Sequence, residues 1–504
     1  MSRRSVATLN LVLALAAGTL LNLLAQQHPF RADLTADKRF TLDTATTHLL
    51  HSLPEAVTVT AYFTGDLPPE LAAVRQDFKD LLAEYASRSG GNLVFEFLDP
   101  GPSAPMQELA ISEGVRPLLA QTRKQDRSEN IQVLMGAVVR MGGRKAVIPA
   151  LQAGPGMEWV LSSAIAQVTL VEKPLIGVMQ GHEEPPLRAL DELAIQLSAQ
   201  YDVEATVIYD SFPINERFSS LLWIDPKDSI TPWQLHRLDE YMAKGHGVVL
   251  AFSPVATQLA TSAEALPRDV GLGPWLAAKG LRLDHSLVAD AKCGEVGVMQ
   301  SGTQRPISLP FPYYPLVDQF KDHPVAHGLD QVMFQCISPI TIIGGDTALR
   351  QEPILLSSAK SAVQPAPFLI DLRHRWSDAD FRSGPQVLGA AVERTDASGG
   401  RLVVFGNGNF CTGDQGGQQV ALPKGNLDLM VNATDWVQRN TALLSIRGKQ
   451  QDHRPIADQG EGVRNLLKWM NLLLPVVIVL LYGLGRRIWR QRQRARRKQP
   501  GHVR

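Results

Sequence analysis

The sequence has few cysteines and no excess of either charge. Its three cysteines, Cys293, Cys336 and Cys411, lie far apart, which excludes a disulfide-rich scaffold and a zinc site made of four thiolates. Their odd number leaves open either one disulfide with a free thiol or three free thiols. Lysine plus arginine and aspartate plus glutamate both number 50, so the formal net charge is zero, which argues against a protein that coats nucleic acid.

Signatures of common enzymes are missing as well. The pair Gly448-Lys449 lacks the upstream glycine and the hydroxyl residue of a phosphate-binding loop, so we expect no ATP hydrolysis by this chain. His182-Glu183 begins like a zinc-protease motif, but Pro186 stands where the second histidine is required. The serine-hydrolase motif G-x-S-x-G does not occur. We therefore predict no catalytic residue, no metal ligand and no cofactor.

The composition is that of a globular protein. At about 150 residues per domain, 504 residues suggest about three domains. Apolar residues make up 44% and charged residues 20% of the chain, which excludes wholesale disorder. A mean hydropathy of -0.06 excludes a protein built mainly of membrane helices.

Two long apolar segments nevertheless predict membrane helices. Residues 5–25 carry no charge and follow Arg3 and Arg4, as in a signal peptide or a signal anchor; the poor spacing of small residues favours an uncleaved anchor. Residues 466–485 form the second segment, in which Gly483 and Gly485 would permit close helix packing.

Basic residues flank both apolar segments. The positive-inside rule therefore predicts two spans in a bacterial inner membrane, with both termini cytoplasmic and residues 26–464 outside. The arginine-rich residues 486–504 adjoin a predicted span, so we expect them to contact anionic membrane lipid rather than nucleic acid.

The first part of the middle region predicts a small α/β unit. The expected elements are a strand at 57–63, a helix at 71–85, a strand at 93–98 and a hairpin of 131–139 with 145–150. A strand, a helix and a strand of these lengths predict a parallel pair, and Gly142-Gly143 predicts the hairpin turn. This order is thioredoxin-like, but the absence of C-x-x-C predicts a redox-inert domain.

A second α/β unit follows a helix predicted at residues 158–170. Its expected strands and helices alternate along the chain: strands at 174–179, 203–208, 221–224, 248–252 and 402–405, and helices at 190–197, 233–244 and 427–437. This alternation predicts an open, mostly parallel sheet with helices on both faces. The proline-rich residues 297–365 predict an insertion or edge hairpins.

Polar residues follow several of these strands. They are Gly181, His182, Glu183, Glu184, Asp225, Asn407 and Asn409. Because parallel sheets bind ligands at the carboxyl ends of their strands, one interpretation is a pocket for a small polar ligand or a peptide. The other, which we favour, is a loop whose histidine and carboxylates bond to nearby backbone and water. We expect Cys411 to be packed rather than nucleophilic.

Several stretches together resemble a known family. They are Asp33-Leu34-Thr35, Lys38-Arg39-Phe40-Thr41-Leu42, residues 57–63, Gly181-His182-Glu183-Glu184, residues 238–254, residues 403–410 and the second apolar segment. The set resembles the GldG-like auxiliary component of ABC transporters, named from the gliding-motility system. The resemblance implies a class I glutamine-amidotransferase-like fold without its nucleophile, and as partners a multi-span permease and a separate ATP-binding subunit. The family has glycine where this chain has Glu183, which argues against a shared ligand there.

These inferences predict six segments. They are an anchor (1–27), a thioredoxin-like domain (28–170), an amidotransferase-like domain (171–448), a tether (449–465), a membrane helix (466–485) and a basic cytoplasmic tail (486–504). The predicted function is a non-catalytic, membrane-anchored accessory subunit of an ABC transport complex, whose outer part binds a substrate or an envelope protein. The alternatives are a free-standing envelope sensor or scaffold, and an envelope hydrolase that uses His182 and Glu183.

Overall fold

The computed structural model describes two parts of the chain. These are residues 41–440, apart from residues 66, 102, 125–126, 152–155, 171, 258, 260–261, 300–305, 372–373, 397–398 and 416–417, and residues 461–497. They belong to two compact units, which comprise residues 1–451 and residues 452–504.

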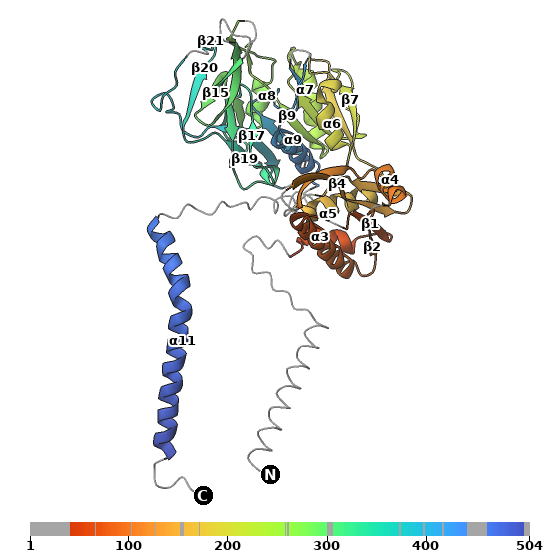
Figure 1. The fold of residues 1–504 in the computed structure, drawn as a ribbon. Coiled ribbons are helices and arrows are strands. Elements are labelled where there is room, and N and C mark those ends of the chain that lie inside the picture. The colour runs from red at the N-terminus through yellow and green to blue at the C-terminus, as the bar shows by residue number, and fades with distance from the viewer. Residues whose placement is uncertain are drawn as a thin grey trace. The chain divides into compact units, whose positions relative to one another are not determined.

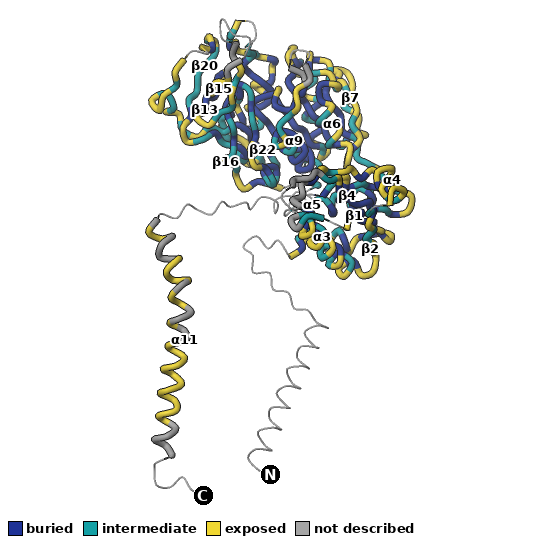
Figure 2. The backbone as a smooth tube through the Cα atoms, in the orientation of Figure 1, coloured by how far each residue is buried: buried dark blue, intermediate teal, exposed yellow. Residues whose placement is uncertain are grey.

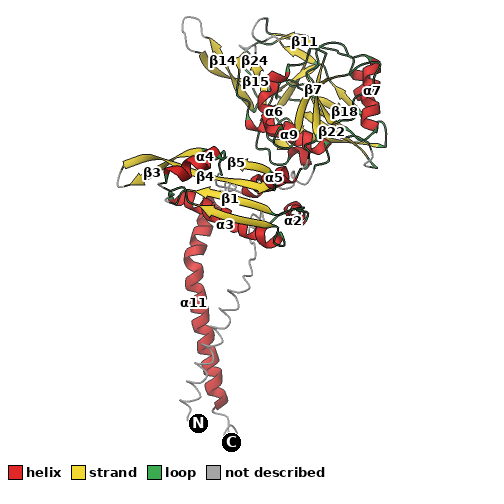
Figure 3. Ribbon diagram, turned by 90° about the vertical axis from the view of Figure 1, so that its right-hand side faces the viewer, coloured by secondary structure: helices red, strands yellow, loops and turns green. Residues whose placement is uncertain are grey.

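The first part of the larger unit contains a sheet of five strands, in the order β2-β1-β4-β3 with β5 also paired to β4 (Figure 3). The elements are α2 (Thr44–His51), β1 (Val57–Phe63), α3 (Pro69–Arg88), β2 (Leu93–Leu98), α4 (Ala104–Ser112), β3 (Pro117–Lys124), β4 (Arg127–Met141), β5 (Arg144–Ile148) and α5 (Met157–Thr169). β1 and β2 are parallel, and β4 and β5 form an antiparallel hairpin, both as predicted. β3 was not predicted, and the thioredoxin-like assignment stays a prediction.

An apolar stripe fixes α3 to this sheet. Val74, Phe78 and Leu82 recur at four-residue spacing and are buried. The ring of Phe78 stacks on that of Phe63 in β1, with centroids 5.7 Å apart. Burying each such side chain stabilises the fold by roughly 1.5–3 kcal/mol, so the helical period of apolar residues determines where α3 lies.

The second part of the larger unit is built on a sheet of eight strands (Figure 1). In spatial order the strands are β16 (Gln319–Phe320), β19 (Leu349–Leu356), β22 (Val387–Arg394), β23 (Leu402–Phe405), β9 (Gly247–Ala251), β8 (Phe218–Ile224), β6 (Leu175–Gln180) and β7 (Asp202–Val207). From β23 to β7 all neighbours are parallel, as predicted. The other three strands are antiparallel and were not predicted. The amidotransferase-like assignment stays a prediction.

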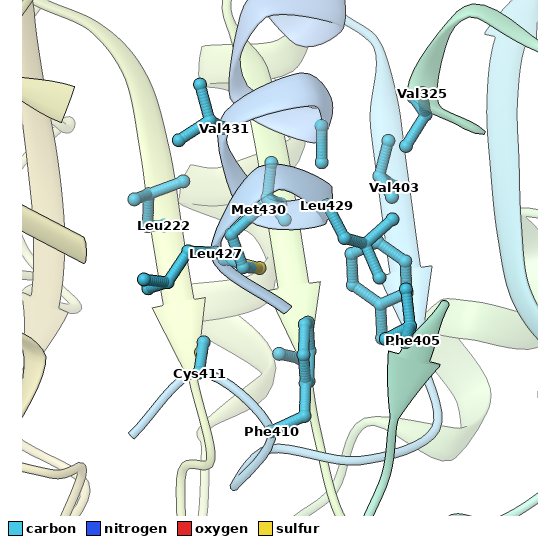
Figure 4. Packing of buried hydrophobic residues seen from close by; sticks show 14 of the residues in the cluster. Leu222, Val325, Val403, Phe405, Phe410, Cys411, Leu427, Leu429, Met430 and Val431 are labelled. Carbon is cyan, nitrogen blue, oxygen red and sulfur yellow. The ribbon is translucent and has the colours of Figure 1, made fainter. Parts of the chain in front are cut away.

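Helices cover both faces of this sheet. They are η1 (Leu187–Leu190), α6 (Asp191–Leu197), α7 (Pro232–Ala243), α8 (Gly273–Ala278), η2 (Pro324–Ala326) and α9 (Lys424–Val437). In β8, Leu222 belongs to a cluster with α6 and α9, whereas Trp223 belongs to a cluster with α7 and α8. Alternate side chains of one strand therefore enter different cores. Figure 4 shows α9 in the first of these clusters, with Leu427 on the side of Leu222 and Leu429 on the side of Phe405.

Small antiparallel sheets of two or three strands occupy much of the segment between β9 and β22. They are β10 (Val255–Thr257), β11 (Glu264–Pro267) and β21 (Phe368–Leu369); β12 (Leu281–Leu283) with β18 (Ile340–Ile342); β13 (Ser286–Asp290) with β20 (Ser361–Pro365); and β14 (Cys293–Met299), β15 (Pro306–Val317) and β17 (Val332–Met333). A further pair, β24 (Asp414–Gln415) and β25 (Gln418–Gln419), precedes α9. Residues 297–365 thus supply hairpins as well as β16 and β19 of the main sheet.

The second unit contains the helix α11 (Glu461–Arg497), which has 37 residues. Within the described parts of the chain, no helix combines the length and the apolar character needed to cross a membrane. In α11, Lys468 and Asn471 interrupt the apolar residues, and arginines occupy much of the helix after Leu484. The predicted membrane helix at 466–485 is therefore wrong, and so is the predicted location in an inner membrane with two spans and both termini cytoplasmic. The other predicted span, residues 5–25, lies outside the described residues.

The glycines predicted to pack in a membrane lie in α11. No atom stands within 4 Å of the position that a Cβ would take at Gly483 or at Gly485, apart from their own chain neighbours and helix backbone. The packing role predicted for these two glycines assumed that residues 466–485 form a membrane helix, and that prediction is wrong.

Candidate functional site

The residues predicted for the site lie at the carboxyl edge of the parallel strands and form two groups. Residues 181–184 follow β6, Asp225 follows β8, and residues 407–409 follow β23. The loop after β8 also contacts the first group, because the backbone N–H groups of Lys227 and Asp228 donate to the carbonyl oxygen of His182 at 2.7 and 3.0 Å.

The first group centres on the buried side chains of His182 and Glu184. Trp223 Nε1 donates to Glu184 Oε1 at 2.8 Å, and the backbone N–H of His182 donates to Glu184 Oε2 at 2.6 Å. His182 Nε2 lies 3.1 Å from Gln234 Oε1, which also accepts from the backbone N–H of Thr231. Because Gln234 Oε1 is an acceptor, Nε2 is protonated in the neutral and in the charged imidazole alike, and the second proton of the charged form is on Nδ1. His182 Nδ1 then faces Glu184 Oε1 at 3.5 Å, too far for a strong hydrogen bond.

The two side chains shift each other's protonation. The interaction with Glu184 raises the pKa of His182, against burial, which lowers it. Burial alone would raise the pKa of Glu184, but donation from His182, from backbone N–H groups and from Trp223 outweighs it, so the pKa is lowered. The group therefore holds a carboxylate with a histidine that binds its proton more tightly than a free imidazole.

We expect His182→Gln to lower the free energy of unfolding by about 1–3 kcal/mol, because buried hydrogen bonds are lost. The loss of stability should be larger at acidic than at alkaline pH. The folded pKa of His182 is raised, so its protonation stabilises the fold fully below the unfolded pKa. That contribution disappears as the pH rises through the folded pKa. Urea unfolding of both proteins at about pH 5.5 and about pH 8.5 measures the difference.

A matched control is His236→Gln, because the His236 side chain is 57% exposed and meets Glu240 only at the surface. We expect this change to cost little at either pH. A penalty for His182→Gln that is the same at both pH values would contradict the charged pair.

The second group centres on Asp225, which is buried and has a φ of 46°. Its Oδ1 accepts from Arg268 Nη1 at 3.2 Å and from the backbone N–H of Ser253 at 3.3 Å. Gly408 N–H donates to Ser253 Oγ at 2.8 Å, and a Cβ on Gly408 would lie 2.3 Å from the Cβ of Asp225. Glycine is required at 408 because the loop after β23 presses against Asp225.

The two asparagines of this loop have different surroundings. Asn407 is fully buried, and its Nδ2 donates to the carbonyl oxygen of Gln335 at 2.6 Å. Asn409 is exposed and lines a pocket of about 120 Å³ together with Phe410 and Asn426. A larger pocket of about 270 Å³ lies at the opposite edge of the sheet, where Arg394 ends β22. None of the residues predicted for the site lines this larger pocket.

The cysteines offer no activated nucleophile. All three are free thiols. Cys411 is fully buried, and burial raises its pKa to about 12; burial likewise raises the pKa of Cys336 to about 12. Both stay protonated at neutral pH, so neither is a thiolate.

Several residues that complete the two groups were not identified in the sequence. They are Trp223, Gln234, Ser253 and Arg268. The segment Thr231-Pro232-Trp233-Gln234 does have the pattern of a capping box, and the structure contains that box at the start of α7. The capping pattern indicates a helix start, but it carries no sign that Gln234 meets a histidine 52 positions earlier.

Comparison with protein families shows the class of this chain. Residues 173–433 match a family described as "ABC-type uncharacterized transport system", and residues 36–140 match a domain of unknown function. The first match covers more than half of the chain, which therefore belongs to this family of ABC transporter auxiliary components. GldG-like proteins are members of the family, so the resemblance noted in the sequence is confirmed.

Comparison with curated proteins gives no match. Among solved structures, the mmIFT52 N-terminal domain has a TM-score of 0.36 at 10% identity and covers 52% of this chain and 97% of its own. A putative ThuA-like protein from Parabacteroides merdae has a TM-score of 0.32 at 13% identity, covering 53% and 91%. PurLQS from Thermotoga maritima has a TM-score of 0.26 at 9% identity, covering 53% and 99%. At such low scores these likenesses carry no argument about function.

Proposed function

We propose that this chain is a non-catalytic accessory subunit of an ABC transport complex, which associates with a multi-span permease and a separate ATP-binding subunit. The observation that carries the proposal is the family match over residues 173–433. The sequence has no phosphate-binding loop of its own, so a transport complex that contains this chain needs another subunit to hydrolyse ATP.

The geometry of the candidate site supports a structural role for His182 and Glu184 rather than a catalytic one. The imidazole of His182 is held by Gln234 and stands beside Glu184, and no serine or cysteine side chain is found hydrogen-bonded to it in the described residues. A histidine acts as general base for a nucleophile only within hydrogen-bond reach of it. The bonds of His182 and Glu184 instead hold the loop after β6 against β8 and α7.

A pull-down of the full chain in mild detergent, followed by mass spectrometry and an ATPase assay, tests the proposal. We expect a subunit with a phosphate-binding loop and a multi-span permease to co-purify in near-stoichiometric amounts, and ATPase activity in the eluate. Substituting the phosphate-binding lysine of the co-purified subunit should abolish that activity, which assigns it to the partner. A chain that is recovered without either subunit would exclude the accessory role.

A further inference from the structure

An exposed apolar patch lies beside the loop after β6. It consists of Val207, Tyr209, Phe212 and Trp233, whose exposed fractions are 42, 60, 67 and 64%. We call these four residues the β7 patch. Large apolar side chains exposed together in this way mark interaction surfaces more often than single exposed ones do.

Hydrogen bonds join the segment after β7, which contains Tyr209, to the start of α7, which contains Trp233. The segment after β7 lies along the first turns of α7, because Thr231 Oγ1 donates to Asp210 Oδ1 at 2.7 Å and Arg237 Nε donates to the carbonyl oxygen of Asp210 at 3.3 Å. Gln234 Nε2 also donates to the carbonyl oxygen of Ile208, at 3.4 Å. Tyr209 and Trp233 therefore lie on segments that are hydrogen-bonded to each other.

The patch continues into an open edge of the main sheet. β7 is the last strand of the eight, and none of its six residues is buried (Figure 2). At the other end of the sheet, β16 has only two residues. A six-residue edge strand such as β7 presents unpaired backbone groups to which another chain can add a strand.

The charges around this edge select the kind of partner. Asp202 and Glu204 are exposed on β7, and Arg217 pairs with Glu204. At the end of the strand, Glu183 and Asp210 are exposed as well. Four exposed carboxylates thus lie along the edge and beside the patch, against two basic side chains there, Arg217 on Glu204 and Arg237 on the backbone of Asp210.

We propose that β7 and the β7 patch bind an extended, basic segment of a partner protein, which adds a strand to the sheet and places apolar side chains on Tyr209, Phe212 and Trp233. The proposal rests on the proposed function, in that the partner is taken to be a subunit of the transport complex. A second copy of this chain is a poorer occupant, because antiparallel pairing of two β7 strands brings their acidic side chains together. Lysine or arginine on the added strand instead meets those carboxylates.

Three synthetic peptides of one length test the proposal on the full chain. The first alternates lysine with valine or leucine, the second has glutamate in place of each lysine, and the third is the lysine peptide with N-methyl groups along one backbone edge. We expect saturable binding of the first by fluorescence anisotropy, and at least about tenfold weaker binding of the other two. Equal binding of the lysine and glutamate peptides, or no loss on N-methylation, would overturn the proposal.

Variants of the chain locate the binding surface. Trp233→Ala and Phe212→Ala should each weaken the lysine peptide about tenfold, as for aromatic residues at the centre of an interface. Leu119→Ala is the matched control, because Leu119 is 75% exposed but lies in β3 of the other sheet. Unchanged binding by both aromatic variants excludes the β7 patch. A dimer that Trp233→Ala dissociates, measured by light scattering, would show that a second copy is the occupant and overturn the basic partner.

The same variants separate this proposal from the proposed function. If the pull-down recovers a permease and an ATP-binding subunit equally well with Trp233→Ala and Phe212→Ala, the accessory role holds and the docking surface is excluded. If neither subunit is recovered but the lysine peptide binds in the predicted manner, the surface holds and its partner lies outside a transport complex.

Discussion

Trp223→Ala should lower the free energy of unfolding by about 3–5 kcal/mol, which is the usual cost of removing a buried tryptophan. Trp223 is fully buried in the cluster formed by β8, α7 and α8. Its removal leaves a cavity and also takes the indole donor from Glu184 Oε1, so a buried carboxylate loses one of its hydrogen bonds. Urea unfolding of the two proteins at neutral pH measures the difference.

Two further variants separate the causes. Trp223→Phe keeps most of the volume but removes the donor, so we expect a smaller loss of about 1–3 kcal/mol. Trp233→Ala removes the same side chain from a position that is 64% exposed and should change the stability by no more than about 0.5 kcal/mol. A loss of under about 1 kcal/mol for Trp223→Ala would show that this core does not depend on the indole.

The periodic elements could be predicted from the sequence because their apolar residues signal burial locally. β1 has the predicted bounds of residues 57–63, and α3, at Pro69–Arg88, contains the predicted helix at 71–85. In both cases the side chains that determine the period are buried in one cluster. The spacing of apolar residues, about two residues in a strand and 3.6 in a helix, is visible within the segment itself. It can be recognised without knowing which element the segment packs against.

The antiparallel part of the main sheet could not be predicted in the same way. β19 and β22 pair Leu349 with Arg394 and Leu356 with Val387, across a long connection that contains β20 and β21. Nothing within either strand indicates this register, because it depends on contacts between residues distant in the sequence. The proline-rich composition of residues 297–365 predicted an insertion or edge hairpins, but it did not predict that β16 and β19 of the main sheet come from this segment.

The candidate site was only partly accessible from the sequence. Placing His182, Asp225 and Asn407 at one edge requires only that parallel strands end on the same side. Their hydrogen-bond partners were not accessible, because the contacts of His182 with Gln234 and of Asp225 with Arg268 join residues 52 and 43 positions apart. The residue types therefore predicted polar loops, but they did not predict which partner each charged side chain binds.

Gly406→Ala should be the second strongly destabilising change, with an expected loss of about 3 kcal/mol in the free energy of unfolding. A Cβ at this position would lie 2.0 Å from the carbonyl oxygen of Ser338. Neither backbone can easily retreat, because Ser338 N–H donates to the carbonyl oxygen of Gly406 at 2.9 Å and Gly406 N–H donates to that of Leu388 at 3.2 Å. The clash is thus with backbone that is held on both sides, not with a flexible side chain.

The same substitution at Gly273 provides the control. Nothing lies within 4 Å of a Cβ there, and Gly273 begins α8, where alanine is a better helix former than glycine. We expect Gly273→Ala to be neutral or slightly stabilising in urea unfolding, and Gly406→Ala to shift the midpoint to much lower urea. Equal free energies of unfolding for the two variants would show that the close approach of Ser338 to the loop after β23 does not position Asn407. The second group of the candidate site would then be held by other contacts.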